Sequence, residues 1–376
     1  MNTETNSEDA IQVSLLTGWL GSGKTTLLNS LLKHEDMSET AVLVNEFGDI
    51  GIDHDLVDTV DEDLVELTTG CICCTIQGDL TRVLRELFLK RVKGEVAKFK
   101  RVLIETTGLA DPAPILHTLI NDPIIATRFY LDGVISTSDA VFGFGQLDRH
   151  EEPRKQAAVA DRIVITKTDM AKEEQLNDLE ERLHSINPTA KIYRVTKGDI
   201  KPDKLFGCGL YDPETKTFDV KEWLREEALR DKNNTQSHDH AHDHAHDHAH
   251  NHAHDHAHHP HGEHEHSHDP ERHGDGISSF CIRYEEPLEW PAFVAWIQTL
   301  ITHRGENLLR IKGIINIDGE DQPLAIHGVQ HIFHHPVRLP EWPSEDHDTR
   351  IVFITKDLKK NIIQNSLEAL QIAAKS

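Results

Sequence analysis

Residues Gly18 to Thr25 read Gly-Trp-Leu-Gly-Ser-Gly-Lys-Thr and match the phosphate-binding pattern G-x-x-x-x-G-K-[ST] at every fixed position. The apolar run Val13 to Thr17 precedes them and predicts a buried strand, and the Leu-rich stretch Lys24 to Lys33 predicts a helix. Strand, Gly-rich loop and helix in this order are the context that the pattern requires. The segment therefore predicts an α/β domain that binds a polyphosphate.

Each fixed position of this loop has a chemical reason. The glycines let the backbone bend, so that N–H groups and the helix N-terminus point at phosphate charge. Lys24 is expected on the outer phosphates, and the Thr25 hydroxyl is expected on a magnesium ion. The loop residues predicted to contact the nucleotide are Gly18, Gly21, Ser22, Gly23, Lys24, Thr25 and Thr26.

Charge and hydropathy exclude several classes of protein. The 376 residues carry 39 Lys and Arg against 64 Asp and Glu, a formal net charge of -25. An acidic surface argues against a general binder of nucleic acid or anionic membrane. No run approaches the roughly 18 apolar residues of a membrane span, and residues 1–10 lack the apolar core of a signal peptide. We therefore expect a cytoplasmic protein.

Three of the five cysteines crowd into Cys71-Ile72-Cys73-Cys74. In a reducing compartment this spacing favours metal or redox chemistry over disulfides. Thiolates select zinc, copper(I) or related ions, and several on one loop can hold one ion. An incomplete ligand set suits a site that passes its metal on. A buried apolar cluster or a dithiol redox pair are the alternatives.

Carboxylates follow two predicted core strands. Residues 40–46 are predicted to form one strand, which ends at Glu46 and is followed by Asp49. Open parallel sheets bind their ligands at this carboxyl end of the strands. The alternative is that these acids are solvated loop residues. The second strand, Arg101 to Glu105, is followed by a loop with Gly108. Phosphate-loop enzymes place such an acid on magnesium or its water shell, and such a glycine at the terminal phosphate. Lys24 and Glu105 are therefore the predicted catalytic residues.

A base-recognition motif follows the strand Arg162 to Thr166. Thr166-Lys167-Thr168-Asp169 resembles the guanine-reading [NT]-K-x-D motif. An Asp here can accept the guanine N1–H and N2–H hydrogens, while the Lys stem lies over the base. Adenine lacks these donors, so Lys167 and Asp169 favour GTP over ATP. With a further strand at 191–196, the domain is predicted to be a parallel sheet of about six strands with helices on both faces.

Composition changes sharply at residues 238–273, which hold 17 of the 28 histidines in an Ala-His-Asp-His pattern. The tract has no apolar face at the helical or the strand period, so it is expected to be disordered. Its imidazoles and carboxylates form many overlapping sites for zinc, nickel, cobalt or copper. A solubilising linker without a metal role is the alternative.

The chain after residue 276 recovers globular composition. Strands are predicted at 277–284, 313–317, 322–328, 331–337 and 350–354, and helices at 287–301 and 359–374, which indicates a small α+β domain. The predicted domains are a disordered N-terminus (1–10), a phosphate-loop domain (11–230), a His-rich linker (231–275) and a C-terminal α+β domain (276–376). Neither the histidines of this domain, His327, His331, His334 and His335, nor Cys208 and Cys281 are assigned a metal role.

Taken together, these motifs resemble the CobW-like P-loop GTPases, and within them the YjiA-type branch. The most specific element is the Cys-x-Cys-Cys motif between the phosphate loop and Glu105-Thr106-Thr107-Gly108. The resemblance runs from about residue 11 to the C-terminus, apart from the His tract. One departure is Thr166, where many GTPases have Asn, and this implies weaker base affinity.

The resemblance implies a GTPase that binds Zn²⁺, or Co²⁺ or Ni²⁺, and delivers it to client metalloproteins. It implies Cys71, Cys73 and Cys74 as ligands, with Glu46 or Asp49 as helpers, and GTP with Mg²⁺ at the phosphate loop. It also implies kinship with GTPases that load nickel into urease and hydrogenase, where GTP favours dimers. Two other functions stay open: a metal buffer or sensor in which the His tract is the working part, and a small-molecule kinase, against which Asp169 argues.

Overall fold

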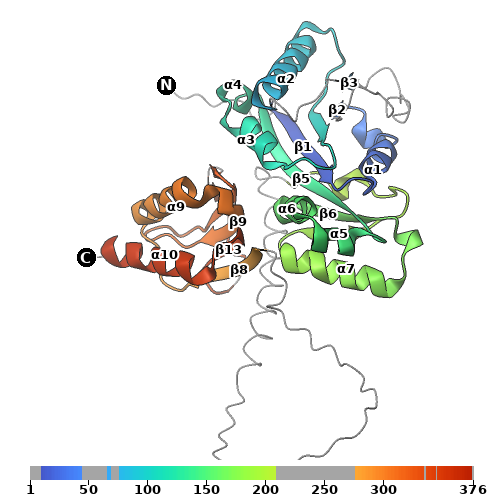
Figure 1. Ribbon diagram of the computed structural model, residues 1–376. Helices are drawn as coiled ribbons and strands as arrows, with labels where there is room; N and C mark the ends of the chain where they lie inside the picture. The colour runs from blue at the N-terminus through green and yellow to red at the C-terminus, as the bar shows by residue number, and fades with distance from the viewer. Residues whose placement is uncertain are drawn as a thin grey trace, which may run out of the picture.

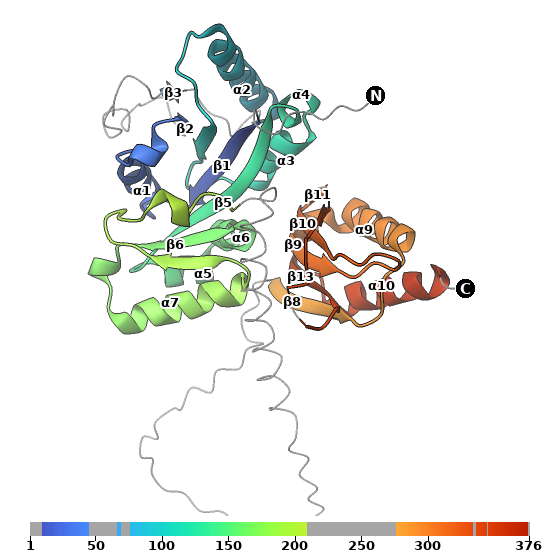
Figure 2. The same cartoon turned by 180° about the vertical axis from the view of Figure 1, so that it is seen from behind.

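The computed structural model describes residues 10–44, 66–68, 76–208, 276–333, 336–343 and 345–374. They form two domains that lie side by side, with the first domain in blue to yellow-green and the second in orange to red (Figures 1 and 2). The predicted boundaries at 230 and 276 stay predictions, because residues 209–275 lie outside the described ranges. None of the described helices has the length and apolar character needed to cross a membrane.

The first domain is built on a parallel sheet. Its strands within the described residues are β1 (Ile11–Gly18), β2 (Thr40–Val44), β3 (Glu66–Thr68), β4 (Arg101–Glu105), β5 (Phe129–Asp139), β6 (Arg162–Thr166) and β7 (Lys191–Arg194). Their order is β3-β2-β4-β1-β5-β6-β7, and every pairing is parallel. The predicted fold class is confirmed. β3 is an additional strand whose three residues are too few to show a period in the sequence.

Helices cover both faces of this sheet, as the apolar strands require. They are α1 (Lys24–Leu31), α2 (Ile76–Lys93), α3 (Ala113–Asn121), α4 (Pro123–Ala126), α5 (Gly143–Arg149), α6 (Glu151–Val159) and α7 (Glu173–Ile186), with short 3-10 turns η2 (Glu35–Met37), η3 (Thr168–Met170) and η4 (Pro202–Lys204). The side chains of β1 point alternately to the two faces of the sheet. Val13 and Leu15 join the apolar cluster with α2 and α3, and Leu16 joins the apolar cluster with α1. Burial of these side chains holds β1 at the centre of the domain.

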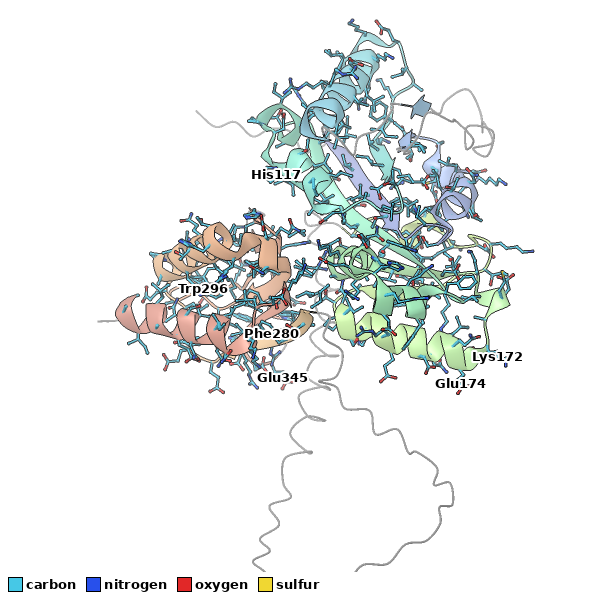
Figure 3. All side chains as sticks on the ribbon, in the orientation of Figure 1. His117, Lys172, Glu174, Phe280, Trp296 and Glu345 are labelled. Atoms are coloured by element: carbon cyan, nitrogen blue, oxygen red, sulfur yellow. The ribbon has the colours of Figure 1, made fainter. Side chains whose placement is uncertain are left out.

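The C-terminal domain is an antiparallel sheet covered by two helices, as predicted. Its elements are β8 (Ile277–Tyr284), α9 (Trp290–Arg304), η5 (Gly305–Asn307), β9 (Leu308–Ile315), β10 (Leu324–Val329), β11 (Ile332–Phe333), β12 (Val337–Arg338), β13 (Thr349–Lys356) and α10 (Lys360–Ala374). The sheet order is β11-β10-β9-β13-β8, and β12 also pairs with β10. Trp296 of α9 packs edge-on against Phe353, and Phe280 stacks on the same ring (Figure 3).

The single strand predicted at 331–337 is wrong. Ile332 and Phe333 form β11, which pairs with Val329 and Gly328 at one end of β10. Val337 and Arg338 form β12, which pairs with the other end of β10. The turn at 330–331, where Gln330 takes a positive φ of 52°, separates β10 from β11, in agreement with the separate strands predicted at 322–328 and 331–337. The break that was not predicted divides β11 from β12, between Phe333 and Val337. Apolar residues on both sides of the break made the stretch look continuous in the sequence.

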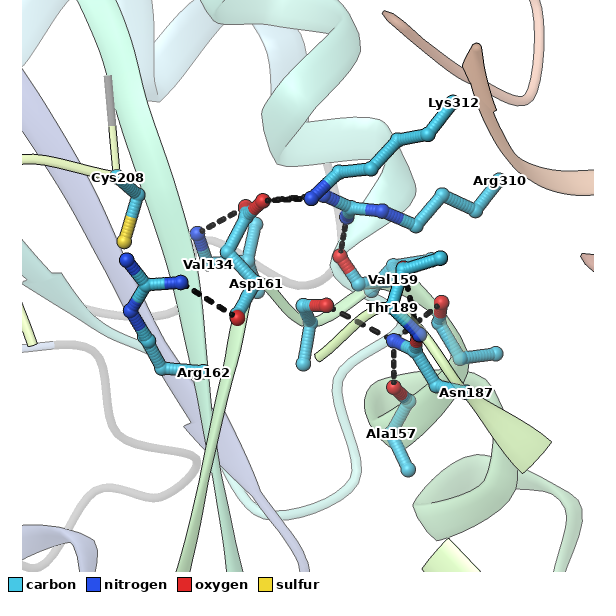
Figure 4. Close-up of polar contacts among 12 residues, drawn as sticks. Val134, Ala157, Val159, Asp161, Arg162, Asn187, Thr189, Cys208, Arg310 and Lys312 are labelled. Carbon is cyan, nitrogen blue, oxygen red and sulfur yellow. Dashed lines mark hydrogen bonds and ion pairs between the residues drawn. The ribbon is translucent and has the colours of Figure 1, made fainter. Parts of the chain in front are cut away.

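A buried ion cluster joins the two domains. Asp161, just before β6, accepts hydrogen bonds from Arg310 of β9 and from the Val134 backbone N–H (3.0 Å), and its carboxylate lies 3.1 Å from Lys312 Nζ (Figure 4). Burial alone would raise the pKa of Asp161, but Arg310 and Lys312 hold it far below its ordinary value. Burial lowers the pKa of Lys312 to about 8. The carboxylate compensates two cations from the other domain, the buried Arg310 and the partly buried Lys312.

We expect Asp161→Asn to lower the free energy of unfolding by about 3 kcal/mol, because it leaves the buried Arg310 and the partly buried Lys312 without their counter-charge. Urea denaturation at neutral pH measures this loss. The control is Glu320→Gln, which breaks the exposed ion pair with Arg338 and should leave the free energy of unfolding close to that of the wild type. Equal costs for the two variants would contradict the structural importance of the Asp161 cluster.

Candidate functional site

The phosphate loop lies where the order of the strands reverses. β1 is flanked by β4 on one side and β5 on the other, and the chain runs from β1 to β2 on one side of the sheet and later from β4 to β5 on the other. Ligands of open parallel sheets bind at such a switch point, beyond the carboxyl ends of the strands. The loop at residues 19–23 follows β1 at this place, and α1 begins directly after it at Lys24.

Tight packing determines the backbone of this loop. A Cβ atom on Gly18 would lie 2.2 Å from Thr137 Oγ1, and the φ of Gly18 is +142°. Gly23 precedes α1 with φ 88° and ψ 22°, a left-handed conformation that favours glycine. The hydroxyls of Ser22 and Thr137 lie 2.6 Å apart in a hydrogen bond. The glycines of the motif are thus required by a positive φ and by close approach to β5.

Lys24 reaches back to the start of the phosphate loop, and Thr25 reaches the end of β4. Lys24 Nζ donates to the carbonyls of Gly18 (2.9 Å) and Trp19 (3.1 Å). Burial lowers the pKa of Lys24, and the Glu105 carboxylate offsets part of this effect. The Thr25 hydroxyl donates to Glu105 Oε1 at 2.9 Å. The structure thus brings together the residues that the sequence assigned to phosphate, magnesium and hydrolysis.

The loop after β4 presses against the phosphate loop. Gly108 is buried, and a Cβ atom on it would lie 2.6 Å from the backbone nitrogen of Leu20. The Gln156 side chain donates to the carbonyls of Gly108 and Ala110. Sequence analysis missed Gln156, because a lone Gln in a polar helical stretch carries no motif and gives no sign of the loop it contacts.

The base-recognition motif is tied to the phosphate loop by side chains. The Thr166 hydroxyl donates to the Ser22 carbonyl at 2.7 Å. Lys167 adopts a positive φ of 55°, and its Nζ donates to the Gly21 carbonyl (2.7 Å) and to Asp139 Oδ2 (2.6 Å). Asp139 is buried and also accepts two backbone N–H groups, from residues 141 and 142. Asp139 is a further residue that sequence analysis missed, although it ends a core strand as Glu105 does.

Asp169 lies exposed in η3, directly after these anchored residues. The neighbouring Thr168 hydroxyl forms a hydrogen bond of 2.7 Å with the Thr196 hydroxyl, after β7. Two residues further on, Gly198 has φ +77°, and a Cβ atom there would lie 2.9 Å from the Thr26 carbonyl. The loop after β7 therefore lies between Asp169 and α1, close to the predicted base site. A Gly after the last predicted strand was its only signal in the sequence.

The predicted metal ligands lie outside the described residues. These are Cys71, Cys73, Cys74, Glu46 and Asp49, together with the His tract at 238–273. In the part of the chain that the structure describes, no group of three or more His, Cys, Asp or Glu side chains is placed to hold a metal ion. Among the described residues, Cys208 and Cys281 are not joined in a disulfide, and burial raises the pKa of Cys208.

The Gly-rich loop lies at the switch point of a parallel sheet. Thr25 contacts Glu105, and Lys167 contacts the loop. This arrangement is that of a P-loop nucleotide hydrolase with a guanine-type motif. Residues 12–194 match the family model for the nucleotide-binding domain of CobW, HypB and UreG, and residues 277–371 match the CobW C-terminal domain. The chain belongs to the CobW/HypB/UreG family, and it is a GTPase.

Named relatives agree with this assignment. The chain is 32% identical over 361 residues to the zinc chaperone YjiA of Escherichia coli, covering 96% of this chain and 99% of that protein. It is 34% identical over 197 residues to the zinc-regulated GTPase metalloprotein activator 1 of Schizosaccharomyces pombe, covering 50% and 47% of the two chains. The crystal structure of Zn(II)-bound YjiA GTPase superposes with a TM-score of 0.67 at 28% identity, covering 96% of this chain and 99% of that one.

We expect Gly108→Ala to lower kcat for GTP hydrolysis by roughly 10- to 100-fold, because the added methyl group must displace either this loop or the phosphate loop at Leu20. Steady-state phosphate release measures the effect. The control is Gly145→Ala in α5, where the Cβ atom would meet the flexible end of Arg149. A Gly108→Ala enzyme with the kcat of the wild type would show that the contact with Leu20 is unimportant.

Proposed function

We propose that this GTPase is a metallochaperone that binds Zn²⁺, or Co²⁺ or Ni²⁺, at Cys71, Cys73 and Cys74 and delivers it to client metalloproteins. Membership of the family supports the proposal, as does the fact that relatives covering most of the chain are named zinc chaperones. Soft thiolates prefer such ions over magnesium or calcium. Glu46 or Asp49 is proposed to supply a further oxygen ligand.

The register of the sheet carries the proposal that metal and nucleotide are coupled. Val44 pairs with Thr68 on one side and with Glu105 on the other, so these three residues share one row at the carboxyl edge. Neighbouring strands lie about 4.8 Å apart, so the backbones of β3 and β4 are separated by about 10 Å. β3 ends at Thr68, three residues before Cys71 in the sequence, in the same row as Glu105, which accepts a hydrogen bond from Thr25.

At the nucleotide end, we propose that Lys24 binds the outer phosphates and that Thr25 and Glu105 hold Mg²⁺, directly or through its water. Hydroxyl and carboxylate oxygens are the hard ligands that Mg²⁺ prefers, and the two side chains already lie within a hydrogen bond of one another. The ion would neutralise charge on the phosphates. On the base side, Asp169 would accept the guanine N–H groups and Lys167 would lie over the ring.

Hydrolysis at such a site needs positioning and charge stabilisation more than covalent chemistry. The loop amides and Lys24 stabilise the charge of the phosphates. The backbone near Gly108 contacts the phosphate loop at Leu20, so we propose that it responds to the terminal phosphate. Ordering of this edge by GTP would change the arrangement of the thiolates, and linkage requires that metal in turn changes nucleotide affinity.

The decisive experiment titrates zinc into protein lacking residues 238–273, with and without a non-hydrolysable GTP analogue. We expect one tightly bound ion whose affinity changes with nucleotide, because Cys71 follows β3 by only three residues and β3 ends in the same row of the sheet as Glu105. The control is the same protein with Cys71→Ser, Cys73→Ser and Cys74→Ser, which should lose this ion.

Two outcomes would contradict the proposal. Loss of nearly all zinc capacity on deletion of the tract would favour a metal buffer in which the histidines do the work. Zinc affinity that is indifferent to nucleotide, with nucleotide affinity indifferent to zinc, would separate the two sites.

The base preference has its own test. Asp169→Asn should weaken GTP binding by roughly 100-fold, because two hydrogen bonds to a charged acceptor are lost. The same change should improve binding of xanthosine triphosphate, whose 2-oxo group can accept from the new amide. Competition with a fluorescent GTP analogue measures both affinities, and an unchanged ratio between them would remove Asp169 from the base site.

We further propose that GTP favours a homodimer through the nucleotide face. Exposed apolar side chains follow four strands at this edge: Leu20 (52% exposed), Leu109 (51%), Phe142 (62%) and Met170 (70%). Exposed apolar side chains gathered at one edge suit an interface.

Light scattering should give twice the monomer mass with a GTP analogue but not with GDP, and Leu109→Ser should lower that mass. Equal masses with both nucleotides would refute the dimer.

A further inference from the structure

Helix α6 contacts the loop after β4, beside the nucleotide site. The Gln156 amide donates to the carbonyls of Gly108 (3.2 Å) and Ala110 (3.0 Å). Lys155, the preceding residue of the helix, lies 3.6 Å from the carboxylate of Asp111. The loop is therefore tied to α6 along much of its length.

Gln156 is suited to hold this loop, because its side chain is 1% exposed and supplies two amide hydrogens to two carbonyls. Gly108 and Ala110 are buried as well. If the amide were removed, water could not readily replace it, and the loop would have to move for its carbonyls to find other donors. Gln156 thus helps to fix the position of Gly108 relative to the phosphate loop.

The C-terminal domain holds both ends of the same helix. At the start of α6, Glu151 accepts from Lys155 (2.9 Å) and from Lys356 at the end of β13 (2.5 Å). These hydrogen bonds lower the pKa of Glu151 to about 2. At the other end, Arg310 of β9 donates to the carbonyl of Val159 (Figure 4). A continuous chain of ion pairs therefore runs from Asp111 through Lys155 and Glu151 to Lys356.

Between these ends, α6 is held as a single body. The Asn187 side-chain nitrogen, with two hydrogens to donate, lies 2.8 to 3.1 Å from three carbonyls at the C-terminal end of α6, those of residues 157, 158 and 160. Ala157 and Ala158 share an apolar cluster with Leu309 of β9 and Ile354 of β13. A change in the position of the C-terminal domain relative to the first domain would therefore shift the helix that carries Gln156.

We propose that Gln156 is a positioning residue for GTP hydrolysis, and that the C-terminal domain sets the rate of hydrolysis through its hold on α6. The inference rests on the proposed role of the loop at Gly108 near the terminal phosphate, and it is independent of the metal site. It gives the C-terminal domain a function in the reaction, although none of its residues reaches the phosphate loop among the contacts of the described residues.

The first test is Gln156→Met in the full-length protein, which keeps the length of the side chain and removes both donors. We expect kcat for GTP to fall about tenfold, since the loop is displaced. Affinity for GDP should stay within about twofold, because GDP lacks the phosphate that the loop faces. A residue that only supported the fold would change both quantities together.

The second test is Lys356→Met, which removes the contact from β13 to Glu151. We expect kcat to fall about threefold, and we expect the double variant with Gln156→Met to be no slower than Gln156→Met alone, since both act through α6. The matched control is Arg338→Met, which breaks an exposed ion pair with Glu320 in the same domain. Its kcat should equal that of the wild type.

Several results would overturn the inference. An unchanged kcat in a folded Gln156→Met protein, or an equal loss of GDP affinity, would remove the positioning role. Multiplicative losses in the double variant would separate the C-terminal domain from Gln156. If Gln156→Met does not fold, Glu151→Gln and Lys356→Met test the link between the C-terminal domain and α6. Each should lower kcat by the same factor, and the variant that carries both changes should be no slower than either one. If Gly108→Ala slows hydrolysis and Gln156→Met does not, the role of the loop stands and this inference alone fails.

Discussion

The hydrogen bond from the Thr166 hydroxyl to the Ser22 carbonyl joins the end of β6 to the phosphate loop. Because a trans peptide points its carbonyl and its N–H in opposite directions, holding the Ser22 carbonyl turns the Gly23 N–H the other way. Lys167 donates a hydrogen bond to the adjacent carbonyl of Gly21, and the buried Asp139 orients that lysine. The segment Thr166 to Asp169 and the phosphate loop are therefore one hydrogen-bonded unit, and this requires β1, β5 and β6 to be neighbours.

The second constraint is electrostatic. Burying Arg310 and Lys312 between two domains is costly unless a carboxylate compensates them, and Asp161 does so from the connection between α6 and β6. Since Asp161 lies two residues after the end of α6, the group that secures the interface also secures the helix that holds the loop at Gly108. Stability of the interface and geometry of the nucleotide site thus depend on the same few residues.

Sequence patterns predicted most of the fold and the nucleotide-binding part of the site. Contiguous motifs carried these predictions, because Lys24, Thr25 and Asp169 each lie in a short segment whose spacing itself has chemical meaning. Gln156 and Asp139 were missed, since their importance comes from partners 48 and 28 residues away in the chain. The division of the predicted strand 331–337 into β11 and β12 was missed because apolar residues lie on both sides of it. The thiolate site stays a prediction, since its cysteines lie outside the described residues.

By itself, the sequence determined the local conformations and the chemical groups. These are a Gly-rich loop between a strand and a helix, an acid at the end of one core strand, and a motif typical of base recognition after another core strand. Such features depend on neighbours in the chain, so composition and period reveal them. The tertiary structure decided which strand ends meet, that Thr166 holds the phosphate loop, and that α6 lies between the loop at Gly108 and the C-terminal domain. These contacts arise only when segments distant in sequence pack together, because burial selects partners by shape and charge across the whole chain.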